Sequence, residues 1–281
     1  MKRLSILALV LPMLGCSPTD EDNKQTNLQI NNQNNAGTTA EQRHTRLPGE
    51  QKRQYTTNNL NDHLLNVGSP TKTKKPVNGV PKKDSALLDV NLIKQNPELK
   101  YGCEVTSLAM MLNYAGVKTN KMELYRLITK DPDPLIKSTK GDILRWGNPA
   151  DGFVGDMTGK KPGYAAFDKP MIDLINKKLP GRAVNLTNKP FERVLAHVSS
   201  GYPVVIWTTG DYRPPDRPEG WYHGKEFIKT PLDLHVVVLV GYDAKYVYLN
   251  DPLSGRKQVK VEKQRFISSW KALKSRAVSY K

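Results

Sequence analysis

The sequence predicts one α+β domain over residues 85–281, with a mostly antiparallel sheet. Two observations support this prediction. Apolar residues recur at helical spacing in the first half of the region, beginning just after Gly102, whereas β-branched runs such as "PVVIWTT" and "HVVVLVGY" occur in its second half. Helices that come before the strands, rather than alternating with them, favour an α+β arrangement. The length is sufficient for one domain with its own core.

Residues 1–15 have the form of an export signal. Lys2 and Arg3 precede an apolar run that is too short to span a bilayer but has the length of a signal-peptide core. The run ends in "LPMLGC", which resembles the lipobox of bacterial lipoproteins, where cleavage precedes the cysteine and its thiol carries diacylglycerol. Met13 is a departure, because leucine or valine is more usual there, and an ordinary secretory signal is the alternative. We therefore expect lipidated Cys16 to anchor the protein on the outer face of a bacterial cell membrane.

Residues 16–84 are rich in asparagine, glutamine, threonine, lysine and proline, and they show no sustained apolar period. Such a segment buries too little apolar surface to offset its chain entropy, so we expect a disordered polar tether. The chain carries 43 Lys+Arg against 27 Asp+Glu, a formal net charge of +16. Outside a cell this charge favours anionic lipid, cell-wall polymers or acidic substrates, although a plain soluble basic surface explains it equally well. Nucleic acid is not an expected partner, because no recognition motif accompanies the charge.

The individual elements follow from local periodicity and from the positions of glycine and proline. The predicted strands cover residues 87–93, 203–209, 234–242 and 245–251. The predicted helices cover residues 103–116, 121–129, 170–179 and 190–201, with a short closing helix near 266–273. Residues 137–166 contain many glycines and prolines and are predicted to be rich in loops, where binding residues concentrate. Gly155, Asp156 and the more distant Trp221 are candidate substrate-binding residues, with a structural turn at Gly155 and Asp156 as the alternative.

The chain contains two cysteines, Cys16 and Cys103, and the sequence around Cys103 differs from the signal-like sequence around Cys16. Cys103 follows the turn residue Gly102 and begins a predicted helix, where unpaired backbone N–H groups and the helix dipole stabilise a thiolate. The thiolate is the nucleophilic form of cysteine, so this position suits a catalytic nucleophile. A small apolar side chain buried under the first helical turn is the alternative, and position alone does not separate the two.

A cysteine nucleophile needs a histidine within hydrogen-bonding reach and a third group that orients the histidine. Of the five histidines, His235 opens a predicted strand whose hairpin is centred at residue 243. This register places His235 directly opposite Asp251 at the open end of the two strands, with Pro252 ending the second. A slip of one residue would turn the two side chains to opposite faces. A surface His–Asp contact is the alternative interpretation.

Several blocks of the sequence resemble the cysteine peptidase family 39-like domains of bacteria, which are papain-like. These blocks are "LIKQNPELKYGCEVTSLAMMLNYAGV", "GFVGD", "GYPVVIW", "LHVVVLVGYD" and "VYLNDPLSG". The resemblance implies that Cys103 is the nucleophile, His235 the general base and Asp251 the orienting carboxylate. It also matches Gln95 to the glutamine that helps to form the oxyanion hole, beside the backbone N–H of the nucleophile.

The resemblance implies an exported, membrane-tethered thiol peptidase that hydrolyses peptide bonds in a peptide or protein substrate through a thioester. The implied chemistry requires no cofactor and no metal, and Cys103, His235 and Asp251 lack the paired spacing of a zinc site. Two alternatives stay open. One is another acyl-transfer activity on the same residues, such as a cell-wall amidase acting on peptide stems, and the other is a non-catalytic papain-like binding protein at the cell surface. The sequence gives no sign of the oligomeric state.

Overall fold

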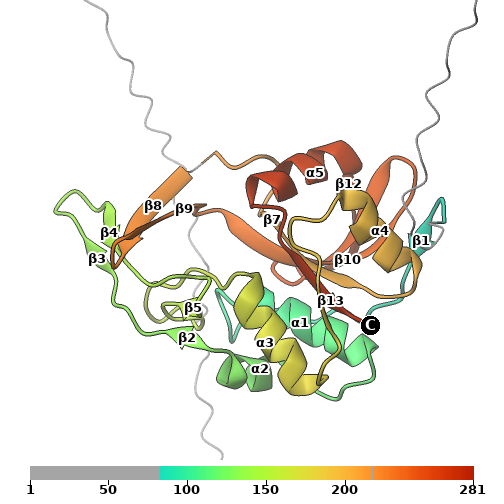
Figure 1. Cartoon of the computed structure of the whole chain (residues 1–281), viewed down its shortest axis with the longest axis horizontal. Coiled ribbons are helices and arrows are strands. Elements are labelled where there is room, and N and C mark those ends of the chain that lie inside the picture. Colours follow the sequence, from blue (N-terminus) through green and yellow to red (C-terminus); the bar gives the residue numbers. More distant parts are fainter. Residues whose placement is uncertain (1–82, 217) are drawn as a thin grey trace, which may run out of the picture. The chain divides into compact units, whose positions relative to one another are not determined.

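The structure is a computed structural model that describes residues 83–216 and 218–281 (Figure 1). The predicted export signal, nearly all of the predicted tether and Cys16 lie outside these residues, so the domain boundaries stay predictions. Within the described part, helices and a large antiparallel sheet confirm the α+β prediction.

The large sheet has seven strands, and every neighbouring pair in it is antiparallel. In order across the sheet they are β12 (Arg256–Glu262), β11 (Tyr246–Asp251), β10 (Leu234–Tyr242), β7 (Val204–Thr209), β13 (Ala277–Tyr280) and β6 (Ala183–Asn185). The short β1 (Ala86–Leu87) pairs with the last two residues of β10. The central strands β10 and β7 are almost entirely buried, which explains their continuous apolar runs.

Helices cover both faces of this sheet (Figure 1). They are α1 (Cys103–Tyr114), α2 (Lys121–Leu127), α3 (Asp168–Lys178), α4 (Phe191–Ser199) and α5 (Lys263–Ala272). Alternate residues of β7 divide between the two faces, as the strand period of two requires. Val205 and Trp207 pack in one core with residues of α1 and α3, whereas Val204 and Ile206 pack in another with residues of α4 and α5.

Helix α1 is buried on every side along its first ten residues, from Cys103 to Leu112. The predicted apolar stripe is confirmed at Val105 and Leu108, which belong to the core shared with α3. Met110 faces elsewhere and packs against Val238 of β10. A helix that is buried on every side belongs to the core, and this one carries its first residue into the interior of the domain.

A smaller four-stranded sheet stands beside the main one, at the left in Figure 1. It contains β3 (Ile136–Lys137), β4 (Ile143–Arg145), β8 (Pro218–His223) and β9 (Glu226–Pro231), and a separate parallel pair joins β2 (Lys130–Asp131) to β5 (Phe153–Val154). Trp221 of β8 packs together with Trp146 and Tyr164 in a small core. Residues 137–166 are rich in loops, as predicted, and the short strands β4 and β5 within them were not predicted because so few residues show no period.

The predicted strand over residues 87–93 is wrong beyond Leu87. Val90 turns its side chain into a core with Met110 and Val238, and its carbonyl accepts a hydrogen bond of 2.8 Å from Nδ2 of Asn250. The apolar residues of this stretch pack beside the sheet and do not add a strand to it.

Candidate active site

His235 and Asp251 form a buried pair at one end of the central strands. His235 is the second residue of β10 and Asp251 is the last residue of β11. Nε2 of His235 lies 2.8 Å from Oδ1 of Asp251, and both side chains are about 95% buried, at 4% and 5% exposure. An imidazole held this closely by a buried carboxylate is fixed in orientation, which leaves Nδ1 as its second reactive nitrogen.

The register that joins the two strands differs from the predicted one. Val238 pairs with Asn250, and a bulge follows between Leu239 and Gly241. Continuing this register places Asp251 opposite the residue two positions after His235, so the expected direct pairing is wrong. An even offset keeps both side chains on the same face, and diagonal neighbours on one face remain within reach of long side chains.

Asp251 is the most heavily bonded carboxylate in the site. Its Oδ1 accepts from His235 and from the backbone N–H of Leu253 at 2.9 Å, while its Oδ2 accepts from the hydroxyls of Tyr212 at 2.9 Å and Ser254 at 2.7 Å. Burial alone would raise the pKa of Asp251, but these donors and the charge of His235 hold it well below its usual range. Sequence reasoning missed Tyr212, which lies in the irregular segment after β7 and gives no periodic signal.

Cys103 begins α1 directly after Gly102, as predicted. A Cβ atom at Gly102 would lie 2.4 Å from Cβ of Leu99, so glycine is required for the chain to enter the helix here. The sulfur of Cys103 is within reach of the backbone N–H of Val236, and Ser107, one turn later, donates to the Val236 carbonyl at 3.1 Å. The start of α1 is therefore fastened to β10 at the residue that follows His235.

The electrostatic setting of Cys103 differs from the one its helix position predicts. The side chain is 7% exposed, and burial raises the pKa of the thiol well above its usual value. The carboxylate of Glu104 raises it further, because Sγ lies 3.4 Å from Oε2 of Glu104. Glu104 is fully buried, and burial raises its own pKa to about 7, although the N–H of Ala166 donates to its Oε1 at 2.9 Å. The thiol therefore responds to the protonation state of its neighbour.

Replacing Glu104 with glutamine is expected to lower the pKa of Cys103. Glutamine keeps an oxygen for the Ala166 N–H but carries no charge, so at about pH 8 alkylation of Cys103 by iodoacetamide should accelerate roughly tenfold. The rate at this one thiol is followed by mass spectrometry. Asp173→Asn, which removes an exposed carboxylate from α3, is the matched control and should leave the rate unchanged. An equal or slower rate in Glu104→Gln would contradict the expectation.

Gln95 lies in the buried segment before α1, at 2% exposure. Its Nε2 donates to the carbonyl of Lys100 at 2.8 Å, and its backbone N–H donates to the carbonyl of Pro252 at 2.9 Å. Pro252 follows Asp251 in the sequence, so this single residue links the segment leading to Cys103 with the end of β11. The Oε1 atom of Gln95 has no hydrogen-bond partner among the described residues.

Gly155, Asp156 and Trp221 lie outside this group. Gly155 has a φ of +78°, and a Cβ atom there would approach the carbonyl oxygen of Pro162 to 2.4 Å. Asp156 accepts hydrogen bonds from the backbone of Thr158 at 2.9 Å and Lys161 at 3.0 Å, which favours the structural-turn interpretation of both residues. Trp221 is fully buried, and its Nε1 donates to Gly147 at 2.8 Å, which favours packing. Their role in substrate binding stays a prediction.

The fold defines a class of protein. A cysteine that begins a buried helix, packed on a mostly antiparallel sheet, is the arrangement of the papain-like cysteine peptidase fold. The model of the Peptidase C39-like family matches residues 87–278, and the chain belongs to this family.

The chain is also similar to individual proteins and to solved structures. A protein of Bacillus subtilis strain 168, named Uncharacterized protein YvpB, is 37% identical over 212 residues, covering 75% of this chain and 80% of that protein. A crystal structure from Bacillus anthracis, whose name places it among C39-like peptidases, shares 39% identity and a TM-score of 0.64, covering 71% of this chain and 98% of its own. Xylellain, a cysteine protease from Xylella fastidiosa, is more distant, with 15% identity, a TM-score of 0.39 and coverage of 72% and 87%.

Over the part of the chain that the structure describes, none of the helices has both the length and the apolar character required to cross a bilayer.

Proposed function

We propose that this protein is a thiol peptidase in which Cys103 is the nucleophile, His235 the general base and Asp251 the residue that orients the base. The observation that supports this most strongly is the buried His235–Asp251 pair, 2.8 Å apart, next to the strand residue on which the start of α1 docks. Burying a carboxylate costs free energy, which the hydrogen bonds of Asp251 offset, and orienting a catalytic imidazole would explain why this charge is buried.

The chemistry would proceed through a thioester. The sulfur of Cys103 attacks the carbonyl carbon of the scissile peptide bond while His235 holds the thiol proton. His235 then gives this proton to the leaving amine as the C–N bond breaks. Water, deprotonated by His235, attacks the thioester and releases the carboxylic acid product with the free thiol restored. Because Nε2 of His235 faces Asp251, Nδ1 is the nitrogen that would exchange the proton with sulfur.

Glu104 would set the pH at which the thiolate forms. Above its pKa of about 7 the Glu104 carboxylate opposes a second negative charge on Cys103. Below that pH Glu104 becomes neutral and the opposition disappears, so a thiolate paired with the imidazolium of His235 is favoured in mildly acidic conditions. A protonated Glu104 could then donate to the sulfur over the 3.4 Å that separates them.

Gln95 would supply one donor of the oxyanion hole. The Lys100 carbonyl occupies one of the two N–H groups on its amide, and the other is available for the oxygen that becomes negative during acyl transfer. The backbone N–H of Cys103, at the first position of α1, is the natural second donor.

Gln95→Ala is expected to lower kcat for peptide hydrolysis by about 10²–10³-fold, because one donor to the transition state is lost. KM should change little, since a ground-state carbonyl oxygen gains less from the donor than the oxyanion does. Steady-state kinetics on one cleaved peptide measure both values. Gln264→Ala, which removes a glutamine from the start of α5, should leave both unchanged. A rise in KM at constant kcat would assign Gln95 to substrate binding instead.

We further propose that the protein acts outside the cell, anchored through a diacylglycerol on Cys16. The support is the lipobox-like "LPMLGC" and the polar segment that follows it. The formal charge of +16 would then hold the domain near anionic cell-wall polymers and acidic peptide segments.

The rate of Cys103 alkylation against pH, in the wild type and in His235→Ala, tests the proposed function. A rapid phase below about pH 7 that disappears in His235→Ala would support a thiolate–imidazolium pair. Both proteins are then incubated with a peptide library that includes cell-wall peptide stems, so that cleavage of stems alone would indicate an amidase. A slow rate typical of an ordinary thiol in both proteins, with no cleaved peptide, would refute the proposal.

A further inference from the structure

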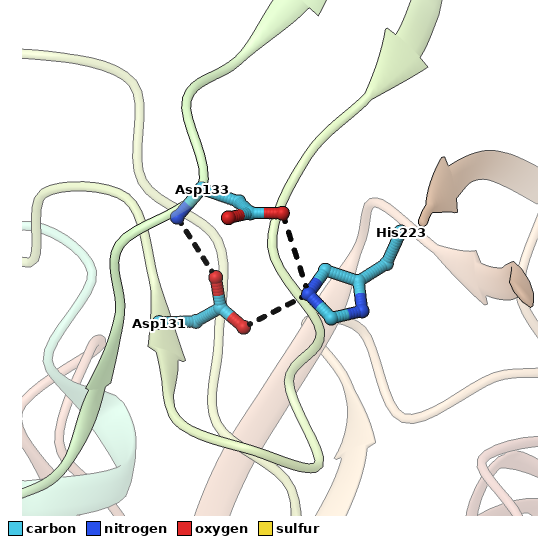
Figure 2. Close-up of side chains that lie close together, drawn as sticks. All are labelled: Asp131, Asp133 and His223. Carbon is cyan, nitrogen blue, oxygen red and sulfur yellow. Dashed lines mark hydrogen bonds and ion pairs between the residues drawn. The ribbon is translucent and has the colours of Figure 1, made fainter. Parts of the chain in front are cut away.

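A second group of polar side chains lies apart from Cys103 and His235, where the β8–β9 hairpin meets the segment after β2 (Figure 2). Asp131 is the last residue of β2, Asp133 lies two positions later, and His223 is the last residue of β8. Nε2 of His223 lies 3.4 Å from Oδ2 of Asp131 and 3.4 Å from Oδ2 of Asp133. The ligand-type atoms of the three side chains all lie within 4.8 Å of one another.

These separations do not describe ordinary hydrogen bonds. A single proton on Nε2 cannot point at two carboxylates at once, and charge-assisted N–H···O bonds are shorter, at about 2.7–2.9 Å. Three ligand-type atoms that all lie within 4.8 Å of one another are instead arranged as ligands around a common centre would be. Zinc–ligand bonds of about 2.0–2.2 Å in a tetrahedron place neighbouring ligand atoms about 3.3–3.6 Å apart. Both N···O distances at His223, 3.4 Å each, fall within that range.

The negative charge of Asp131 and Asp133 also favours the binding of a cation. Two carboxylates face one imidazole, and within residues 83–216 and 218–281 no lysine or arginine forms an ion pair with Asp131 or Asp133. This is unusual in a chain with a formal charge of +16, where cationic side chains are abundant. A proton on His223 would balance only one of the two negative charges, whereas a divalent cation would balance both.

Asp131 is held in place as a metal ligand would be. Its side chain is 5% exposed, its Oδ1 accepts from the backbone N–H of Asp133 at 2.9 Å, and its Oδ2 accepts from that of Asn148 at 3.1 Å. A Cβ atom at Gly147 would lie 2.6 Å from Oδ1, so the chain makes room for this carboxylate. Hydrogen bonds of this kind orient the ligands of metal sites. The side chains of Asp133 and His223, at 48% and 28% exposure, leave an entry path and room for water.

We propose that Asp131, Asp133 and His223 bind a divalent metal ion of the zinc class, with water in the remaining coordination position. Two carboxylates and an imidazole suit such an ion, whereas calcium prefers oxygen ligands alone. The ion would fasten the β8–β9 hairpin to the segment after β2, and strand β9 leads within four residues to His235. Its role is to fix the part of the chain that precedes β10, and it does not depend on the proposed peptidase chemistry.

Zinc binding by the full chain tests this proposal. The protein is stripped with a chelator, desalted, and titrated with Zn²⁺ in competition with a chromogenic chelator. We expect one tight site per chain in the wild type, with an affinity at least about 100-fold lower in Asp133→Asn and in His223→Gln. These two residues are chosen because their side chains are partly exposed, whereas the Asp131 carboxylate accepts two backbone hydrogen bonds. Glu219→Gln, which removes another carboxylate from β8, is the matched control and should bind as the wild type does.

Unfolding gives a second readout that does not involve activity. With free Zn²⁺ at about 100 times the wild-type Kd, the unfolding equilibrium constant of the wild type should fall by about 100-fold, and that of His223→Gln, with its weaker site, by no more than about twofold. Absence of a tight site in the wild type would overturn the proposal. Equal zinc uptake by all four proteins would overturn it as well, because the metal would then be bound elsewhere, for example by the thiol of Cys103.

Discussion

Replacing Cys103 with alanine is expected to lower kcat/KM for peptide hydrolysis by at least about 10⁴-fold, because no other described side chain can form the thioester. The substitution removes one buried sulfur atom, so the free energy of unfolding should fall by only about 1 kcal/mol. The measurement is steady-state cleavage of a peptide found in the library, with thermal unfolding of the same preparation to show that the fold is intact.

The chain provides a matched control in its other cysteine. Cys16→Ala removes the thiol proposed to carry lipid and leaves the peptidase domain unaltered, so the purified protein should keep the wild-type kcat/KM. Equal cleavage by Cys103→Ala and wild type would show that the hydrolysis does not use this thiol. In that case the papain-like domain would belong to the non-catalytic alternative.

The candidate site was predictable because its members are marked by local features. Cys103 follows a glycine at the start of a largely apolar helix, and His235 precedes a run of valines in the longest described strand. The exact register between β10 and β11 was not predictable, because the bulge at residues 239–241 leaves no mark in a uniformly apolar strand. His235 and Asp251 nevertheless lie on the same face, as predicted, because the predicted register was wrong by an even number of residues.

Other residues gave no such signal. Tyr212 adopts a φ of +63° in an irregular segment, and its contact with Asp251 depends on how that segment folds over the sheet. Glu104 gave no such signal either, because an acidic residue in the first turn of a helix is ordinary. Asp131 and Asp133 are neighbours in the sequence, but His223 is far from both, and no metal-ligand spacing connects it to them. Only the folded hairpin brings them together.

Asp251→Ala is expected to be the most destabilising single change in the site, at about 3–5 kcal/mol in the free energy of unfolding. It leaves the buried donors of His235 and Tyr212 without an acceptor, and each of these unpaired donors keeps its cost of desolvation. It also frees the imidazole to rotate, so the hydrolysis rate should fall by about 10²-fold or more. Chemical denaturation and steady-state kinetics measure the two effects.

Asp251→Asn separates shape from charge. The amide oxygen can still accept from Nε2 of His235, and the amide nitrogen can donate to the hydroxyls of Tyr212 and Ser254, so much of the stability should return. The folded-state pKa of Asp251 lies below its ordinary value of 3.8, so its charge stabilises the fold above that pH and this contribution is lost as the pH falls through the folded-state pKa. The stability difference between wild type and Asp251→Asn should therefore be full at neutral pH and shrink below about pH 4. A difference that stays constant down to about pH 2 would show that the charge of Asp251 does not stabilise the folded site, and that its hydrogen bonds alone hold His235 in place.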